Sequence, residues 1–159
     1  MEAVLAGDVA SVFRVMSNEL STPKILFCPE DQRRIQAASF SPTAGSVVGG
    51  NQVVYLSNNS NVSYFVGLDA WEDSPSSFLS GDDNWLVGGE ASNVASKGVP
   101  VRSGVLAIWT NTAVAWSEAR HDRKGNIGLA DGSVQSFSNA KLTEALRHTG
   151  MATNRLVFP

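Results

Sequence analysis

The sequence predicts a single α+β domain, in which an N-terminal amphipathic helix packs on an antiparallel sheet that ends in a β-meander and a short final helix. Apolar residues follow a helical period near the start, and short β-type runs separated by turn residues fill the last third. The length of 159 residues suits one domain with a sizeable core. Charged residues make up only 17%, against 20 Ser, 14 Gly and 11 Asn, a composition that favours a loop-rich protein displayed outside the cytoplasm.

The first predicted element is a helix over residues 9–20. Five apolar side chains recur at spacings of three and four residues and so share one helix face: Val9, Val12, Phe13, Met16 and Leu20. Asp8 is placed to cap the helix start, and Pro23 to end the helix. Residues 25–28 form a short apolar run, which predicts a buried strand leading into an exposed acidic turn at residues 30–31.

The middle of the chain is richer in turn residues than in periodic runs. Two strands are predicted there, at residues 52–56 and 63–68, and in the second one Tyr64 and Phe65 lie on opposite faces. Residues 69–103 combine turn formers with acidic residues. This segment is predicted to be a long surface excursion with short strands.

The last third predicts the antiparallel meander. Four β-type runs alternate with turn residues, at positions 105–109, 112–120, 126–130 and 133–137. Asp131-Gly132 predicts a type I′ turn between the last two, because Asp and Gly best tolerate the positive φ that this turn needs at both central residues. The resulting register places Leu129 opposite Val134.

A short helix and an apolar tail complete the predicted fold. Asn139 is placed to cap the helix, and Gly150 to end it in a left-handed conformation. The inner helix face carries three apolar residues, Leu142, Ala145 and Leu146. The tail at residues 156–158 is expected to dock on the sheet.

Charge and hydropathy argue against two classes of protein. The formal charge is −3, from 12 Lys and Arg against 15 Asp and Glu, whereas a nucleic-acid-binding domain is usually basic. The longest unbroken apolar run, at residues 105–109, falls far short of the roughly 20 residues of a membrane-spanning helix. Met1 is followed by Glu2 rather than by a basic region and an apolar stretch, so no signal peptide is recognised.

Cys28 is the only cysteine, and it has two interpretations. It is either a small buried apolar residue or a thiol whose disulfide partner lies outside this sequence. No Cys/His cluster exists along the sequence, which excludes a structural zinc site.

Motifs of enzymes are sparse. Ser117, His121 and Asp131 can be drawn as a hydrolase set, but no serine stands in a Gly-x-Ser-x-Gly elbow, and no group is identified that would form an oxyanion hole. Neither a Walker loop nor a dinucleotide fingerprint occurs. His148 is assigned a structural or surface role in the last turn of the final helix.

Acidic residues gather on the predicted excursion, namely Asp69, Glu72, Asp73, Asp82, Asp83 and Glu90, with Asn84 among them. Several oxygen ligands on a flexible loop suit calcium, and a solvated acidic face is the alternative. No EF-hand spacing is present. The candidate calcium ligands are Asp69, Asp73, Asp82, Asp83 and Asn84.

Two of the four tryptophans are candidates for a sugar-binding surface. Trp71 and Trp85 lie in the predicted excursion, where they either form an exposed aromatic platform or pack inward to hold the loop. Trp109 and Trp116 lie in predicted strands and are expected in the core or on a sheet face.

His121 is followed, after nine intervening residues, by Asp131-Gly132, within the stretch "RHDRKGNIGLADGSVQSF". This stretch resembles the C-terminal signature of type IV pilin-like proteins, in particular the type II secretion pseudopilins abundant in Verrucomicrobia and Planctomycetes. Three further stretches resemble the same family: "MSNELSTPKILFCPED", "SYFVGLDA" with the later "SGDDN", and "TGMATNRLVFP". Together they are spread along the chain from residue 16 to residue 159.

The resemblance implies a pilin-like globular head with a structural role in a type II secretion or type IV pilus-like filament. The implied partners are other pseudopilin subunits and components of the secretion machine, in the periplasm or at the cell surface. Family members begin with a basic leader, a peptidase site and a long apolar helix, none of which occurs in these residues, so the chain is expected to be the head alone. Membrane anchoring would then come only through that helix.

The resemblance also bears on single residues. His121 and Asp131-Gly132 are expected to hold the final hairpin. Such proteins often carry a cysteine in the segment that precedes the head, which favours a disulfide for Cys28. The heads of related subunits bind calcium, so the resemblance keeps calcium as a candidate ligand of this chain. The alternatives to a non-enzymatic filament subunit are a minor subunit that binds carbohydrate or exported substrate and, more remotely, a serine hydrolase.

Overall fold

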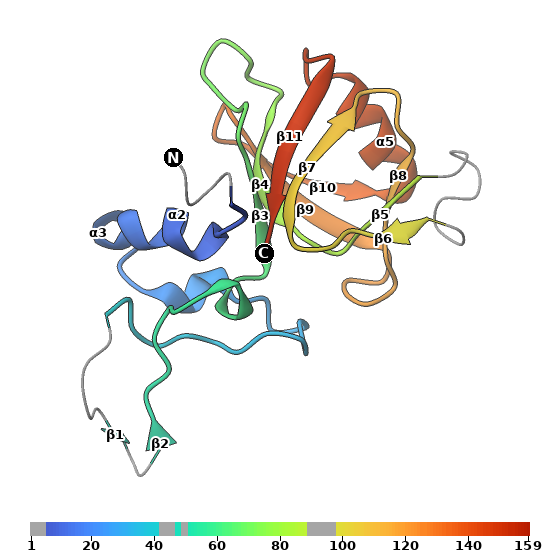
Figure 1. Cartoon of the computed structure of the whole chain (residues 1–159). Helices are drawn as coiled ribbons and strands as arrows, with labels where there is room; N and C mark the ends of the chain where they lie inside the picture. Colours follow the sequence, from blue (N-terminus) through green and yellow to red (C-terminus); the bar gives the residue numbers. More distant parts are fainter. Residues whose placement is uncertain (1–5, 42–46, 49–50, 89–97) are drawn as a thin grey trace.

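The computed structural model describes residues 6–41, 47–48, 51–88 and 98–159 (Figure 1). A six-stranded antiparallel sheet has the order β10-β9-β4-β3-β11-β7. Its strands are β3 (Tyr64–Gly67), β4 (Phe78–Asp82), β7 (Gly104–Trp109), β9 (Lys124–Leu129), β10 (Val134–Ser138) and β11 (Thr153–Phe158). The mixture of helix and antiparallel sheet confirms the α+β class.

A second antiparallel sheet has the order β6-β5-β8, with β5 (Trp85–Val87), β6 (Val99–Pro100) and β8 (Val114–Trp116). A separate small ladder joins β1 (Val47–Val48) to β2 (Asn51–Gln52). The helices are α2 (Val9–Val15), α3 (Ser17–Leu20), α5 (Asn139–Arg147) and the 3₁₀ segments η1 (Pro23–Leu26) and η2 (Asn59–Asn61). No described helix has the length and apolar character needed to cross a bilayer.

The predicted helix at residues 9–20 is two helices, divided at Met16. Asp8 caps the first one as expected, since its side chain accepts a 3.0 Å hydrogen bond from the Ser11 backbone N–H. The predicted strand at residues 25–28 was wrong. Pro23 occupies the first turn of η1, where its fixed φ suits a helix start and its missing N–H is not needed.

Two apolar cores lie on the two faces of the large sheet, and β11 contributes to both because its side chains alternate. Leu156 and Phe158 belong to the larger core, which fills the space between the two sheets and is closed by α5. Val157 belongs to the smaller core, together with Val9 and Phe13 of α2. The two helices accordingly lie on opposite sides of this sheet (Figure 1).

Trp85 is the centre of the larger core. It is 1% exposed, and its ring lies 5.4 Å from Phe65, 6.1 Å from Phe78 and 5.6 Å from Trp116 between centroids, each in an edge-to-face arrangement. The short strands predicted within residues 69–103 are present as β4, β5 and β6, but the prediction of a surface excursion was wrong for residues 78–87, and residues 89–97 lie outside the described residues. This segment supplies central strand β4 and the buried side chain of Trp85.

The predicted C-terminal meander was wrong in its pairing. Strands form near the predicted positions, but only β9 and β10 pair with each other; β7 pairs with β11, and β8 pairs with β5 of the smaller sheet. The reason is the tail. Residues 153–158 alternate apolar side chains toward two cores, so the tail inserts as a full strand between β3 and β7 instead of docking on the sheet surface.

The turn at Asp131-Gly132 joins β9 to β10 as expected, but it is not type I′. Only Gly132 has positive φ, 82°. Its N–H donates to Leu129 O at 3.0 Å, and Leu129 N–H donates to Ser133 O at 2.8 Å. These bonds close a three-residue loop with glycine in the left-handed position. Val134 consequently faces Gly128, and the predicted pairing with Leu129 was off by one residue.

The final helix α5 begins at Asn139 and buries Leu142 and Leu146, as predicted. Asn139 does not cap it. Its side-chain oxygen accepts a 2.7 Å hydrogen bond from the Trp116 backbone N–H and so attaches the helix start to β8. Gly150 has φ 80° and lies two residues beyond the helix end at His148, in the left-handed conformation that was expected.

Candidate functional site

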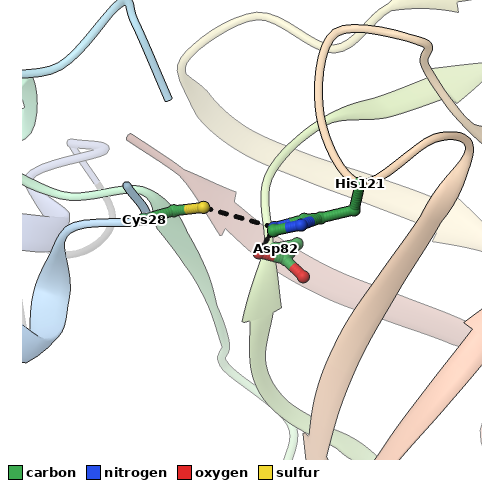
Figure 2. A group of neighbouring side chains, drawn as sticks. All are labelled: Cys28, Asp82 and His121. Atoms are coloured by element: carbon green, nitrogen blue, oxygen red, sulfur yellow. Dashed lines mark hydrogen bonds and ion pairs between the residues drawn. The ribbon is translucent and has the colours of Figure 1, made fainter. Parts of the chain in front are cut away.

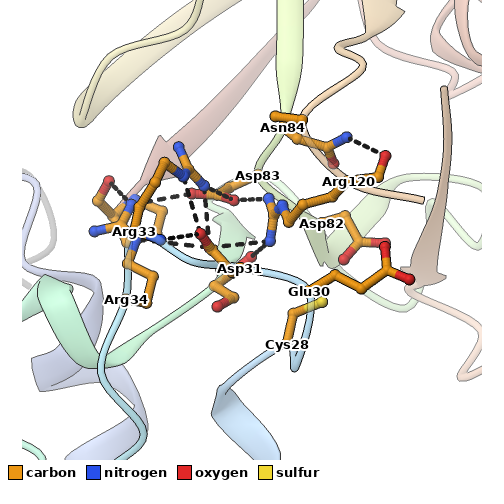
Figure 3. Close-up of polar contacts among 12 residues, drawn as sticks. Cys28, Glu30, Asp31, Arg33, Arg34, Asp82, Asp83, Asn84 and Arg120 are labelled. Atoms are coloured by element: carbon orange, nitrogen blue, oxygen red, sulfur yellow. Dashed lines mark hydrogen bonds and ion pairs between the residues drawn. The ribbon is translucent and has the colours of Figure 1, made fainter. Parts of the chain in front are cut away.

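Two clusters of buried polar side chains meet where β4 ends. Asp82 is the last residue of β4, and Asp83 and Asn84 lead into β5; all three are buried. The loop after η1 and the loop before β9 approach them, as Figure 3 shows. The expectation of a solvated acidic face was therefore wrong at these three positions.

The first cluster is an arginine–aspartate cluster of Asp31, Asp83, Arg33, Arg34 and Arg120. Arg120 bridges the two carboxylates, since Nη1 lies 3.1 Å from Asp31 Oδ2 and Nη2 binds Asp83. Arg33 and Arg34 reach Asp83 at 2.9 and 3.0 Å. Burial alone would raise the pKa of Asp31, but the hydrogen bond from Arg33 and the charges of Arg120 and Arg33 lower it overall.

This cluster ties together segments that are distant in sequence. Arg34 donates to Asn59 O in η2 at 2.9 Å and to Pro159 O after β11 at 2.7 Å. Arg120 also donates to Ser63 O at 3.3 Å. The predicted exposed turn at residues 30–31 was half wrong, because Glu30 is exposed but Asp31 is fully buried.

The second cluster consists of Cys28, Asp82 and His121 (Figure 2). His121 Nε2 lies 3.2 Å from Cys28 Sγ and 3.6 Å from Asp82 Oδ1. One donor atom from each residue lies within 4.8 Å of the other two, so the group can hold a metal ion. Cys28 and Asp82 are each 2% exposed, whereas the His121 side chain is 29% exposed.

Hydrogen bonds fix the orientation of these groups. Glu30 Oε2 lies 3.1 Å from His121 Nδ1 and also accepts from the His121 backbone N–H at 2.7 Å. A carboxylate can only accept, so Nδ1 carries a proton, and Nε2 is the ring nitrogen that faces Cys28 and Asp82. Asp82 Oδ2 accepts from the Asn126 N–H at 2.7 Å. Burial raises the pKa of Asp82 despite this bond and the nearby charge of His121.

The backbone that carries His121 is strained. His121, Asp122 and Arg123 have φ of 54°, 48° and 61°, three consecutive left-handed residues that are not glycine. The neighbouring Gly125 is held under the ring of Trp116, since a Cβ there would lie 2.6 Å from ring atoms. Such strain persists only where surrounding contacts enforce it, and it concentrates at functional sites.

The signature residues His121 and Asp131-Gly132 do not meet. They stand at opposite ends of strand β9, and only Asp131-Gly132 forms the hairpin turn. The hydrolase set is not assembled either. The hydrogen bond recorded at Ser117 Oγ comes from the Ala119 N–H, at 3.4 Å, while the His121 ring faces Cys28, Glu30 and Asp82.

The candidate calcium ligands are not gathered, so calcium is not supported. Asp69 binds Arg155, Asp83 is surrounded by arginines, and Asp73 is exposed on the preceding loop. Asn84 donates its amide to Ser117 O and Arg120 O at 3.4 Å. Glu90 lies outside the described residues.

The structure places Trp71, Trp85 and Trp109 in different surroundings. Of the two alternatives for Trp85, inward packing is confirmed and exposure on a surface platform is excluded, because the side chain is buried in the core. Trp71 is 63% exposed beside a cavity of about 350 Å³ that Met151 and Arg155 also line. Trp109 was expected in the core or on a sheet face. Its side chain is 64% exposed and follows the buried Ile108 on β7, so Trp109 lies on a sheet face.

Sequence reasoning missed Glu30, Asp31 and the three arginines, and it excluded zinc on a premise that the fold overturns. Cys28 and His121 are 93 residues apart in sequence, yet their side chains touch. The available signal was a pair of polar dipeptides, Asp82-Asp83 in the predicted excursion and Arg120-His121 at the end of the predicted strand 112–120. No protein-family model, curated protein or solved structure matches this chain.

Proposed function

We propose that this chain is the globular head of a pilin-like filament subunit, with a structural, non-enzymatic role in a type II secretion or type IV pilus-like system. Its partners are then other pseudopilin subunits and components of the secretion machine, in the periplasm or at the cell surface. The proposal begins from the resemblance of four stretches to pseudopilins, and one structural observation supports it.

That observation is where the resembling stretches meet. "CPED" contributes Cys28 and Asp31, "SGDDN" contributes Asp82 and Asp83, and "RHDR" contributes Arg120 and His121. These residues lie far apart in sequence and converge on one place at the end of β4 (Figures 2 and 3). The stretches that carry the resemblance thus meet in one cluster that holds three loops together, which supports reading them as parts of one head architecture.

The experiment follows the natural protein in its own cells. The reading frame upstream of the Met1 codon is expected to encode a basic leader, a peptidase site and an apolar helix. An antibody raised against the 159-residue head is expected to detect an inner-membrane-anchored protein that protease removes from spheroplasts. A product that fractionates with the cytoplasm and resists protease in spheroplasts would refute the proposal.

A second candidate is a substrate-binding or carbohydrate-binding minor subunit, favoured by the exposure of Trp71. Its indole lies beside the Asp69–Arg155 ion pair, so an aromatic face and polar groups border one cavity. Binding of oligosaccharides or exported proteins is expected to be lost in Trp71→Ala. Trp109→Ala removes an equally exposed tryptophan on β7 and serves as the matched control. Equal binding by the wild type and Trp71→Ala would exclude this candidate.

A further inference from the structure

We infer that Cys28, Asp82 and His121 form a binding site for a zinc-like transition-metal ion, with one coordination position left open. The inference rests on the donor set, its geometry, its supporting hydrogen bonds and its charge. It is independent of the filament role.

The donor atoms already lie at distances typical of a tetrahedral site. Bonds of about 2.3 Å to sulfur and about 2.05 Å to nitrogen, at the tetrahedral angle, separate the two donors by about 3.5 Å. Cys28 Sγ and His121 Nε2 are 3.2 Å apart, and His121 Nε2 and Asp82 Oδ1 are 3.6 Å apart. Two of the three donor–donor distances therefore match a tetrahedral site, and the third, between Cys28 Sγ and the Asp82 carboxylate, is no longer than 4.8 Å.

The supporting hydrogen bonds are those of a metal site. A histidine ligand usually donates its second ring N–H to a carboxylate, which fixes the tautomer and strengthens the metal bond. Glu30 Oε2 lies 3.1 Å from His121 Nδ1, in the place of such a carboxylate, and the Asn126 N–H donates to Asp82 Oδ2, while the other oxygen, Oδ1, faces His121. Both ligands are thus oriented by groups that would not themselves bind the ion.

The ionic contacts of Asp82 are compatible with a bound cation. Asp82 is buried, and among the described residues no arginine or lysine forms a salt bridge with it; His121 is its only ionic partner. If Cys28 binds an ion as a thiolate, the thiolate and the Asp82 carboxylate together match the charge of a divalent ion. A neutral thiol with a protonated histidine is the competing arrangement, and the experiment separates the two.

The donor set selects the class of ion. Thiolate and imidazole suit zinc and related transition metals, whereas calcium and magnesium take oxygen ligands. Three protein ligands leave a fourth position, and the partial exposure of His121 opens that side of the cluster to solvent. A water molecule or a donor group from a partner can occupy it.

The test uses the full 159-residue protein after chelator treatment. Calorimetric titration with Zn²⁺ is expected to give one ion per chain. Titration with Co²⁺ is expected to give visible bands of tetrahedral cobalt and a near-ultraviolet sulfur-to-cobalt band. The second band assigns the site without any variant, because Cys28 is the only cysteine in the chain.

Variants then test each ligand. Cys28→Ser, Asp82→Asn and His121→Asn are each expected to lower zinc affinity by more than 100-fold; asparagine suits position 121 because it tolerates a left-handed backbone. Glu30→Gln is expected to cost 10–100-fold, as for other groups that orient a ligand. His148→Asn and Asp131→Asn are matched controls with unchanged affinity. The inference is overturned if the wild type binds no zinc, if cobalt gives no sulfur band, or if Cys28→Ser and His121→Asn bind zinc as the wild type does.

Discussion

Asp82 and Asp83 are neighbours at the end of β4, yet they have opposite surroundings (Figure 3). Asp83 contacts three arginines, and its cluster holds three positive against two negative side chains. Asp82 has one ionic partner among the described residues, His121, and accepts from the Asn126 N–H; burial raises its pKa. Consecutive side chains in an extended segment point to opposite sides, so one dipeptide serves two clusters.

Arg120 and His121 are likewise neighbours in sequence that belong to different clusters. Arg120 joins Asp31 and Asp83, whereas His121 joins Asp82 and Cys28. In the first cluster each carboxylate is paired with arginines, which suits a structural role. In the second cluster Asp82 is buried beside Cys28 and His121, a donor set that suits the metal site inferred above. The following predictions test this difference, beginning with the largest effect.

Arg120→Met is expected to be the most destabilising substitution. It leaves two buried carboxylates without their bridging cation, and breaking a buried ion pair in this way costs roughly 3–5 kcal/mol. Urea denaturation measures the change in the free energy of unfolding. Arg155→Met removes an exposed ion pair and is expected to have a much smaller effect. Similar losses in the two variants would show that the arginine–aspartate cluster has no special structural role.

The two aspartates are expected to respond differently in metal-free protein at pH 7. Asp83→Asn leaves three arginines facing one carboxylate and is expected to cost about 3 kcal/mol. Asp82→Asn removes an uncompensated buried charge while keeping an acceptor for the Asn126 N–H, so it is expected to be neutral or stabilising. Chemical denaturation of both variants in chelator gives the comparison, and equal losses would contradict it.

Gly125→Ala is expected to disturb both clusters to a smaller extent. The added methyl group would overlap the Trp116 ring, and overpacking of this kind costs about 1–3 kcal/mol. Gly128→Ala, in the same strand, places its Cβ 3.6 Å from Ser80 O, an ordinary contact, and is the matched control. Thermal melting of the two variants measures the difference. If the melting temperature of Gly125→Ala is no lower than that of Gly128→Ala, the left-handed conformation of residues 121–123 does not depend on the close contact between Gly125 and the Trp116 ring.

The smallest expected effect is a change in the pH dependence of stability. The folded-state pKa of Asp31 is lower than its ordinary value, so its contribution to stability is full above about pH 4 and is lost as the pH falls through the folded pKa. Asp31→Asn should therefore flatten the acid side of the stability curve. Asp82, with its raised pKa, contributes in the opposite direction. An unchanged acid slope in Asp31→Asn would contradict the assignment.

Local features of the fold could be predicted from the sequence, and strand partners could not. The cap at Asp8, the alternation in β3 and the inner face of α5 follow from short-range spacing. The insertion of β11 between β3 and β7 depends on which distant strand offers a complementary face. The turn at Gly132 shows how strongly the strand register depends on local backbone conformation. Because Gly132 alone has positive φ in this turn, the turn is not type I′ and the register differs by one residue from the predicted one.

The candidate site, like the strand partners, could not be predicted from the sequence. Cys28, Asp82 and His121 each attract attention as single residues, but spacing along the chain gives no reason to combine them. Their meeting requires the loop after η1 to reach the start of β9, which the buried Arg120–Asp31 contact secures. The arginines were overlooked because charged residues are usually solvated, and nothing local marks the ones that are buried.

The most direct test of the difference between the clusters is the melting temperature with zinc and with chelator. Zinc at 100 times its dissociation constant stabilises the folded state by about 2.7 kcal/mol, or roughly 5–10 °C for a chain of this size. The wild type and Asp83→Asn are expected to show this shift, and Asp82→Asn is expected to lose it. No shift in the wild type, or an equal shift in both aspartate variants, would contradict the division into a structural cluster and a metal site.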